Sequence, residues 1–147
     1  MTDTPVSGVA FAEMTPADLD EARDLWRRTP GIGLYEADDS VAALTAYLAR
    51  NPGFSRVARA GGVLIGAVLC GHDGRRGAVY HLAVKAGCRG RGVGRQLLEQ
   101  CLDRLAAVGI RRCNLFVLKT NTEAAGFYDR LRWRERVDLR MLSKDLL

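Results

Sequence analysis

The stretch Arg89-Gly90-Arg91-Gly92-Val93-Gly94 lies between a predicted strand, Ala78–Val84, and the start of a predicted helix. Glycine has no Cβ, so backbone N–H groups in such a loop can approach an anion closely and the chain can reach positive φ. The N-terminus of the following helix adds unsatisfied N–H groups and about half a positive charge. The arginines of the stretch, together with Arg95, add cations. The stretch therefore predicts a cradle for phosphate groups.

Two familiar phosphate loops do not fit this stretch. A Walker A loop needs Gly-Lys followed by Ser or Thr, and the chain contains no Gly-Lys pair. The dinucleotide pattern G-x-G-x-x-G needs glycine at the position that Arg95 occupies. A tight turn without a ligand is the remaining alternative, and alternate glycines with interspersed arginines disfavour it.

Strands and helices alternate on both sides of the cradle. Strands are predicted at Val9–Met14, Phe54–Ala60, Val63–Gly71, Ala78–Val84, Arg112–Leu118, Trp133–Val137 and Leu139–Leu146. Helices are predicted after Thr15, after Asp38-Asp39-Ser40, from Val93 and after Thr120, which would form a capping box with Glu123. The first helix has an apolar inner face of Leu19, Ala22, Leu25 and Trp26. This order predicts an α/β layered fold with a mixed sheet.

Length and composition are those of one soluble globular domain over residues 1–147. Hydrophobic residues make up 48% and charged residues 27% of the 147 positions, which is ordinary for such a domain. No apolar run approaches the roughly 18 residues of a membrane span, and the N-terminus shows no signal-peptide pattern. The four cysteines form no CxxC pair and fit no common zinc spacing. We therefore expect reduced thiols, no metal site and a cytoplasmic location.

Charge is unevenly distributed along the chain. Residues 1–50 hold nine acids and four bases, whereas residues 51–147 hold eight acids and eighteen bases. Nineteen of the 22 basic residues are arginine, which favours bidentate contacts with phosphate or carboxylate. The C-terminal two-thirds is thus expected to meet an anion, either nucleic acid or a phosphate-bearing small molecule. No recognised nucleic-acid motif accompanies the charge, which disfavours the first reading.

The same residues resemble a known family. Arg89 to Gly94 is similar to the R/Q-x-x-G-x-G/A signature of the GNAT N-acetyltransferase superfamily. Asn121-x-x-Ala124-x-x-Phe127-Tyr128 resembles the family's second motif, N-x-x-A-x-x-F/L-Y. Within that superfamily the sequence is similar to small bacterial members of the YpeA type or of the ribosomal-protein-acetyltransferase type. One departure is Arg132-Trp133, where many members have Gly-Phe. The resemblance implies a mixed, mostly antiparallel sheet of six to seven strands flanked by about four helices.

The resemblance also implies a reaction and a site. An amine would attack acetyl-coenzyme A directly in a ternary complex, with no metal, and Tyr128 would stabilise the departing thiolate. A backbone bulge around Leu82–Val84 would free N–H groups for the thioester oxygen. The residues expected to bind the coenzyme are Leu82, Ala83, Val84, Arg89, Gly90, Arg91, Gly92, Val93, Gly94, Arg95 and Asn121.

The sequence does not determine which amine is the acceptor or which residue is the general base. A lysine-like amine, with a pKa near 10.4, is neutral about once in 2,500 molecules at pH 7, so a base matters for such acceptors. Strand alternation puts Tyr80 and His81 on opposite faces. The resemblance implies that a base on this strand would lie on the face of Ala78 and Tyr80, which disfavours His81. Glu36, Asp38 and Asp39 are alternatives, although helix capping and solvation also explain them.

The same resemblance predicts the binding partners. We expect a small-molecule or peptide amine, no nucleic acid and no membrane, in a monomer or homodimer. The alternative function is a catalytically silent domain that binds or senses acyl-coenzyme A.

Overall fold

The computed structural model describes residues 6–147, which divide into two compact units. The first unit extends to Phe116, and the second comprises Val117–Leu147. A single domain over residues 1–147 stays a prediction.

The first unit contains a five-stranded sheet in the order β1-β2-β3-β4-β5. Its strands are β1 (Ala10–Glu13), β2 (Arg56–Ala60), β3 (Val63–His72), β4 (Gly77–Val84) and β5 (Cys113–Leu115). Neighbouring strands pair antiparallel except β4 and β5, which pair parallel. The mixed, mostly antiparallel sheet is as predicted, but it has five strands rather than six or seven.

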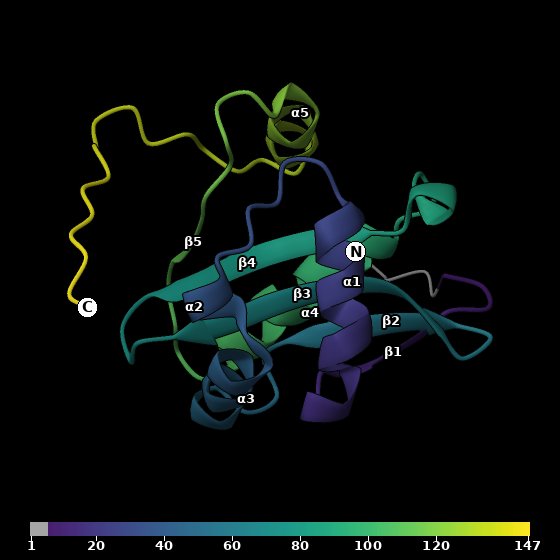
Figure 1. The fold of residues 1–147 in the computed structure, drawn as a ribbon. Helices are drawn as coiled ribbons and strands as arrows, with labels where there is room; N and C mark the ends of the chain where they lie inside the picture. The colour runs from purple at the N-terminus through teal and green to yellow at the C-terminus, as the bar shows by residue number, and fades with distance from the viewer. Residues whose placement is uncertain (1–5) are drawn as a thin grey trace. The chain divides into compact units, whose positions relative to one another are not determined.

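Helices cover both faces of this sheet (Figure 1). A 3-10 turn (Pro16–Asp18) leads into α1 (Leu19–Arg28), and α2 (Glu36–Asp39) and α3 (Val41–Arg50) lie on the same face as α1. The opposite face carries α4 (Val93–Ala107), which follows a second 3-10 turn (Ala86–Cys88) and contacts β2, β3 and β4. The acidic segment predicted to cap a helix is itself the one-turn α2, and Ser40 caps α3 by accepting from Ala43 N–H.

The core lies between α1, α3 and the sheet. The four predicted inner residues of α1 are all buried, with Leu19, Ala22 and Trp26 fully enclosed. Full burial of a side chain of this size stabilises a fold by about 1.5–3 kcal/mol. Glycines in β3 let helices approach from both sides: a Cβ on Gly66 would lie 2.9 Å from Leu97 of α4, and one on Gly71 would lie 2.6 Å from the Tyr47 hydroxyl of α3.

The second unit contains one helix, α5 (Thr122–Arg130). Asn121 is its N-cap and accepts from Ala124 N–H at 3.1 Å, so the predicted capping box at Thr120 is wrong by one residue. The helix ends with Arg132 in the left-handed region, at φ +67°. Trp133 N–H then bonds the Tyr128 carbonyl at 3.0 Å, which completes a Schellman end. Arginine thus makes the turn at the position where the resemblance implied glycine.

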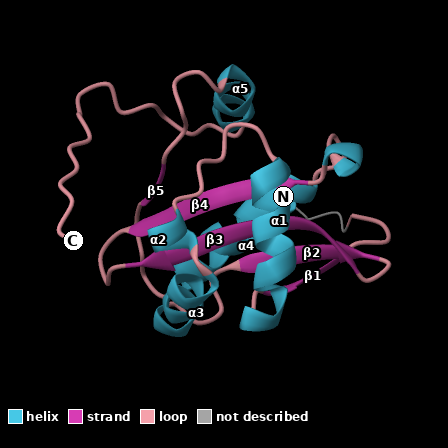
Figure 2. Ribbon diagram, in the orientation of Figure 1, coloured by secondary structure: helices cyan, strands magenta, loops and turns pink. Residues whose placement is uncertain are grey.

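The structure corrects three of the strand predictions. Residues after α5 form turns and loop rather than strands at Trp133–Val137 and Leu139–Leu146 (Figure 2). Their apolar side chains, such as Val137 and Leu142, are exposed. Alternation alone does not make a strand, because each strand also needs a hydrogen-bonding partner. The strand predicted at Arg112–Leu118 shortens to β5 for the same reason, since only three of its residues pair with β4.

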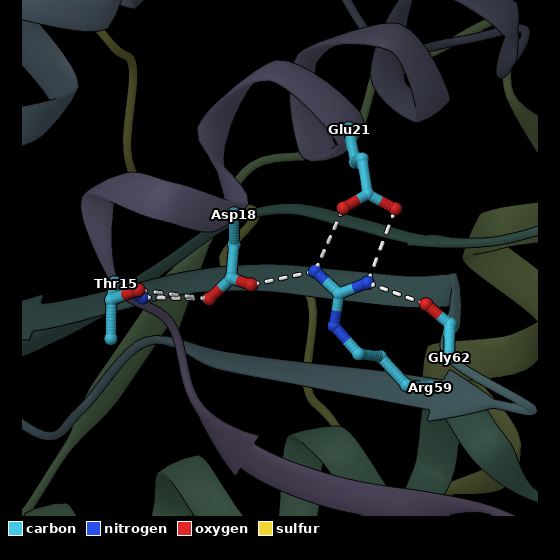
Figure 3. Close-up of polar contacts among 5 residues, drawn as sticks. All are labelled: Thr15, Asp18, Glu21, Arg59 and Gly62. Atoms are coloured by element: carbon cyan, nitrogen blue, oxygen red, sulfur yellow. Dashed lines mark hydrogen bonds and ion pairs between the residues drawn. The ribbon is translucent and has the colours of Figure 1, made fainter.

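Arg59 of β2 ties the sheet to the start of α1 (Figure 3). Its guanidinium donates to both oxygens of Glu21, at 2.9 and 3.1 Å, and to Asp18 at 2.7 Å. A further bond reaches the Gly62 carbonyl at 2.9 Å. The hydrogen bond from Arg59 holds the pKa of Glu21 below its usual value. Bidentate, charge-assisted contacts of this kind are stronger and more directional than neutral hydrogen bonds.

We expect Arg59→Met to lower the free energy of unfolding by about 1–2 kcal/mol, because it leaves two carboxylates without their shared cation. Arg28→Met is the matched control, since Arg28 pairs only with the exposed Asp24 of its own helix and should lose less than about 0.5 kcal/mol. Urea unfolding of both variants measures the difference. Equal losses would show that the Arg59 contacts do not anchor α1.

Candidate functional site

A β-bulge interrupts β4 near its C-terminal end. Tyr80 pairs with Leu69 and Ala83 pairs with Ala67, so two residues of β4 oppose one residue of β3. Those two residues are His81 and Leu82. His81 adopts φ +56°, which is uncommon for a residue other than glycine, although histidine is among the more tolerant types. The bulge implied by the resemblance is present, and it begins one residue before the predicted range.

The other side of β4 loses its strand partner at the same place. β5 pairs with Gly77, Ala78 and Val79 only. Within residues 6–147, no strand continues that pairing alongside Tyr80–Val84. Backbone N–H and C=O groups require partners, so an unpaired strand edge is a place where an extended ligand can bind.

The bulge changes the direction of His81. Its ring lies 5.2 Å from the Trp26 ring of α1, between centroids, and Tyr80 meets Tyr47 of α3 at 6.4 Å. Since α1 and α3 cover the same face of the sheet (Figure 1), consecutive residues of β4 point to one face. The prediction from strand alternation, that His81 and Tyr80 point to opposite faces of the sheet, is therefore wrong.

His81 forms a close pair with Asp39 of α2. Its Nε2 lies 3.0 Å from Asp39 Oδ1, and both side chains are largely buried, at 17% and 10% exposure. The second oxygen of Asp39 accepts from Tyr35 N–H at 3.0 Å. Arg23 of α1 donates to the Asp39 carbonyl at 2.9 Å and lies 3.5 Å from Glu36. Sequence reasoning missed this pair, and only a recognised bulge at His81 would have pointed to it.

The predicted anion cradle leads into α4. Gly90 and Gly92 adopt φ +80° and +84°, and nothing lies within 4 Å of where a Cβ would stand on either residue. Gly92 is the N-cap of α4, and its carbonyl accepts the Gln96 N–H at 3.0 Å. The helix amides before Gln96, on Val93 and Gly94, have no carbonyl one turn earlier in the helix to bond. An open, left-handed glycine turn thus stands at the positive end of a 15-residue helix.

The arginines of the cradle have different environments. Arg89 Nε donates to the Val84 carbonyl at 3.0 Å, which links the cradle to the end of β4. Arg95 pairs with Glu99 one helical turn later, at 2.8 Å. Arg91 is exposed, and no hydrogen bond or ion pair joins it to a described residue. The structure therefore brings Leu82, Ala83 and Val84 next to the loop of residues 89–95.

Tyr128 and Asn121, the other predicted site residues, belong to the second unit. Tyr128 packs edge-on against Phe127 at 5.1 Å and Trp133 at 5.9 Å, between ring centroids. Burial raises its pKa to about 12. Its hydroxyl therefore stays protonated, and able to donate a hydrogen bond, at any physiological pH.

Within residues 6–147, no group of three or more His, Cys, Asp or Glu side chains is placed to hold a metal ion. None of the helices described there combines the length and hydrophobicity that a bilayer crossing requires.

Comparison with known proteins identifies the fold. The profile of the family described as Acetyltransferase (GNAT) family matches residues 19–132. An acetyltransferase of Pectobacterium atrosepticum is 31% identical over 130 residues, which cover 88% of this chain and 90% of that protein. The PaiA N-acetyltransferase of Thermoplasma acidophilum, solved with coenzyme A, has a TM-score of 0.74 at 19% identity and covers 84% of this chain and 87% of its own. Aminoglycoside N-acetyltransferase AAC(6')-Iy, also solved with coenzyme A, has a TM-score of 0.74 at 21% identity. The match covers 97% of this chain and 99% of that chain.

The bulged strand beside a glycine-capped helix is thus part of an acetyltransferase fold. The chain belongs to the GNAT family, and it is an N-acetyltransferase. The predicted family and the predicted enzyme class are confirmed, and so is the α/β fold class.

Proposed function

We propose that this enzyme uses acetyl-coenzyme A to acetylate a primary amine, which attacks the thioester directly in a ternary complex. The observation that carries the proposal is the adjacency of the bulged, half-unpaired end of β4 to the glycine cradle of α4. Acetyl-coenzyme A is the co-substrate. The two structural neighbours described above were solved with coenzyme A, which agrees with this choice.

The cradle binds the pyrophosphate of the coenzyme. Residues 89–95 supply backbone amides at the positive end of α4, and the open space at Gly90 and Gly92 lets phosphate oxygens approach them. Arg91 adds a cation that is not engaged elsewhere among the described residues. Because Arg89 and Arg95 already have protein partners, their contribution is mainly to shape the loop.

The unpaired edge of β4 binds the pantetheine arm. The backbone of Leu82, Ala83 and Val84 can hydrogen-bond its amides as a neighbouring strand would. The bulge disturbs the regular ladder there, so a backbone N–H becomes available to the thioester oxygen. Such a donor stabilises the oxyanion that forms when the amine attacks.

Tyr128 stabilises the departing thiolate, and Asn121 either contacts the coenzyme or only caps α5. A thiol has a pKa near 8.5, whereas that of Tyr128 is raised to about 12. Full proton transfer from Tyr128 would therefore be uphill by about 3.5 units, or about 5 kcal/mol. Tyr128 thus acts as a hydrogen-bond donor to the sulfur rather than as an acid.

The acceptor is a small molecule or a peptide with a free amine. A catalytically silent domain that binds acyl-coenzyme A would share the cradle, so turnover separates the two functions. Release of free thiol from acetyl-coenzyme A, followed over a panel of amines, is that measurement. Coenzyme binding without thiol release for any amine would favour the silent domain.

We expect Gly92→Asp to abolish coenzyme binding, because it puts a negative charge where backbone amides meet phosphate. The parent should gain about 2.7 kcal/mol of stability at an acetyl-coenzyme A concentration 100 times its Kd, and the variant none. Thermal unfolding with and without the ligand measures both.

Gly109→Asp is the matched control for this variant. Gly109 lies just beyond the opposite end of α4, at φ +85° against +84° for Gly92, and a Cβ would be equally unobstructed at both positions. The control therefore carries the same backbone strain and the same charge, and its ligand-induced shift should equal that of the parent. Stabilisation of Gly92→Asp by the ligand to the parental extent would contradict the cradle.

We expect Tyr128→Phe to keep coenzyme binding and to lower kcat and kcat/KM alike, by about 100- to 1,000-fold. The change removes one hydroxyl and keeps the ring contacts with Phe127 and Trp133. Steady-state kinetics with the best acceptor of the panel measures the loss. Near-parental kcat would make Tyr128 a packing residue.

A further inference from the structure

We propose that Asp39 and His81 form the general base of this enzyme, in which His81 removes a proton from the acceptor's ammonium group. The proposal rests on the proposed amine acetylation and names the residues that prepare the amine. It depends on the contact between His81 Nε2 and Asp39 Oδ1, at 3.0 Å, and on the position of His81 within the bulge of β4.

The contact with Asp39 determines which nitrogen of the imidazole is basic. A carboxylate only accepts hydrogen bonds, so neutral His81 must carry its proton on Nε2 and donate it to Asp39. Its lone pair then lies on Nδ1. The carboxylate also stabilises the imidazolium that forms when Nδ1 accepts a proton, as in other carboxylate–histidine pairs.

The carboxylate itself is held from several sides. Oδ2 of Asp39 accepts from the Tyr35 amide, and the Arg23 guanidinium bonds the Asp39 carbonyl. Asp39 is 7% exposed, whereas Glu36 has a side chain that is 84% exposed. A buried carboxylate with a hydrogen bond to each oxygen can hold the imidazole in a fixed orientation. The sequence had suggested solvated acids at these positions instead.

The basic nitrogen remains accessible. Among the described residues, Trp26 Nε1 is the only fully buried side-chain nitrogen or oxygen without a hydrogen-bond partner. Nδ1 of His81 also has no partner among them, so it is not fully buried. The Trp26 ring packs against the imidazole and limits its rotation, and no described residue occupies the hydrogen-bonding position of Nδ1.

The bulge brings the base to the reacting end of the coenzyme. His81 directly precedes Leu82–Val84, the residues proposed to hold the pantetheine arm and the thioester. A non-glycine residue held at φ +56° is strained, and such strain persists where the surroundings impose it. Here one irregularity both disturbs the ladder and turns the imidazole toward α1 and α2.

The proton balance of the reaction is complete with this base. The ammonium gives one proton to His81 Nδ1, and the neutral amine attacks the carbonyl carbon, forming the C–N bond. The C–S bond then breaks, and the thiolate takes a second proton from the former amine to leave as the thiol. His81 returns its proton to water, so one proton is released for each acetyl group transferred.

The charged and titratable groups around His81 are few. Asp39 on α2 bonds it directly, and Arg23 on α1 and Glu36 on α2 reach it only through Asp39. From β4 itself, Tyr80 points to the same face. The pH dependence of kcat/KM is therefore compared between the parent and variants of both members of the pair.

His81→Asn tests the proposal, because asparagine tolerates positive φ and cannot act as a base. With an amine of pKa near 10, kcat/KM at pH 7.5 should fall about 100- to 1,000-fold. The loss should shrink as the pH approaches the pKa of the amine, because the neutral amine needs no base, and the rise of kcat/KM with pH should move to that pKa. Stabilisation by acetyl-coenzyme A should be unchanged.

His72→Asn is the matched control. His72 is the only other histidine, and its Nδ1 accepts the Gly74 amide in the turn after β3. This variant should keep the parental kcat/KM and the parental acidic limb. A loss equal to that of His81→Asn would overturn the assignment, because it would show that any lost histidine has this effect.

Asp39→Asn tests the orienting role without removing the imidazole. The Tyr35 amide requires an oxygen, so the new amide should present its NH₂ to Nε2 and force the proton onto Nδ1. We expect kcat/KM to fall about 10- to 100-fold or more with coenzyme binding intact. If His81→Asn and Asp39→Asn both keep the parental turnover and the parental pH profile, the Asp39–His81 base is overturned, while the proposed acetylation of an amine stands. A parent that turns over no amine would overturn the proposed function as well.

Discussion

The extra residue of β4 between Tyr80 and Ala83 is the constraint on which the rest of the site depends. It puts two residues opposite one on β3 and requires positive φ at His81. It also coincides with the point where β5 stops pairing with β4. Without it, the edge of the strand would be a regular ladder and His81 would face away from α1. One local irregularity therefore determines both the backbone that we propose to bind the coenzyme and the direction of the imidazole.

The surrounding elements hold that irregularity in place. Trp26 of α1 packs on the His81 ring, and α2 carries the carboxylate that bonds it. Arg59 ties the start of α1 to β2, on the same sheet. On the other face, α4 packs against β2, β3 and β4, and its glycine-capped N-terminus meets the end of β4 through Arg89. The helices therefore position the proposed phosphate cradle and the proposed base relative to one strand.

Much of this arrangement could be predicted from local sequence patterns. The inner face of α1 follows from its periodicity, and the cradle follows from alternate glycines before a helix. The direction of the His81 side chain could not be predicted in this way, because it depends on the register of β4 against β3, which no single segment encodes. The closing strands at Trp133–Val137 and Leu139–Leu146 failed for a related reason, since alternation does not supply a pairing partner. The burial of Asp39 could not be predicted either, because an acidic turn near the start of a helix usually faces solvent.

The central claim is that the amine attacks acetyl-coenzyme A directly while both are bound. Initial rates measured as a function of both substrates test it, together with mass spectrometry of the protein incubated with acetyl-coenzyme A alone. The account predicts intersecting double-reciprocal lines and an unmodified chain. Parallel lines, with an acetyl group carried on one of the four cysteines or another side chain, would contradict it.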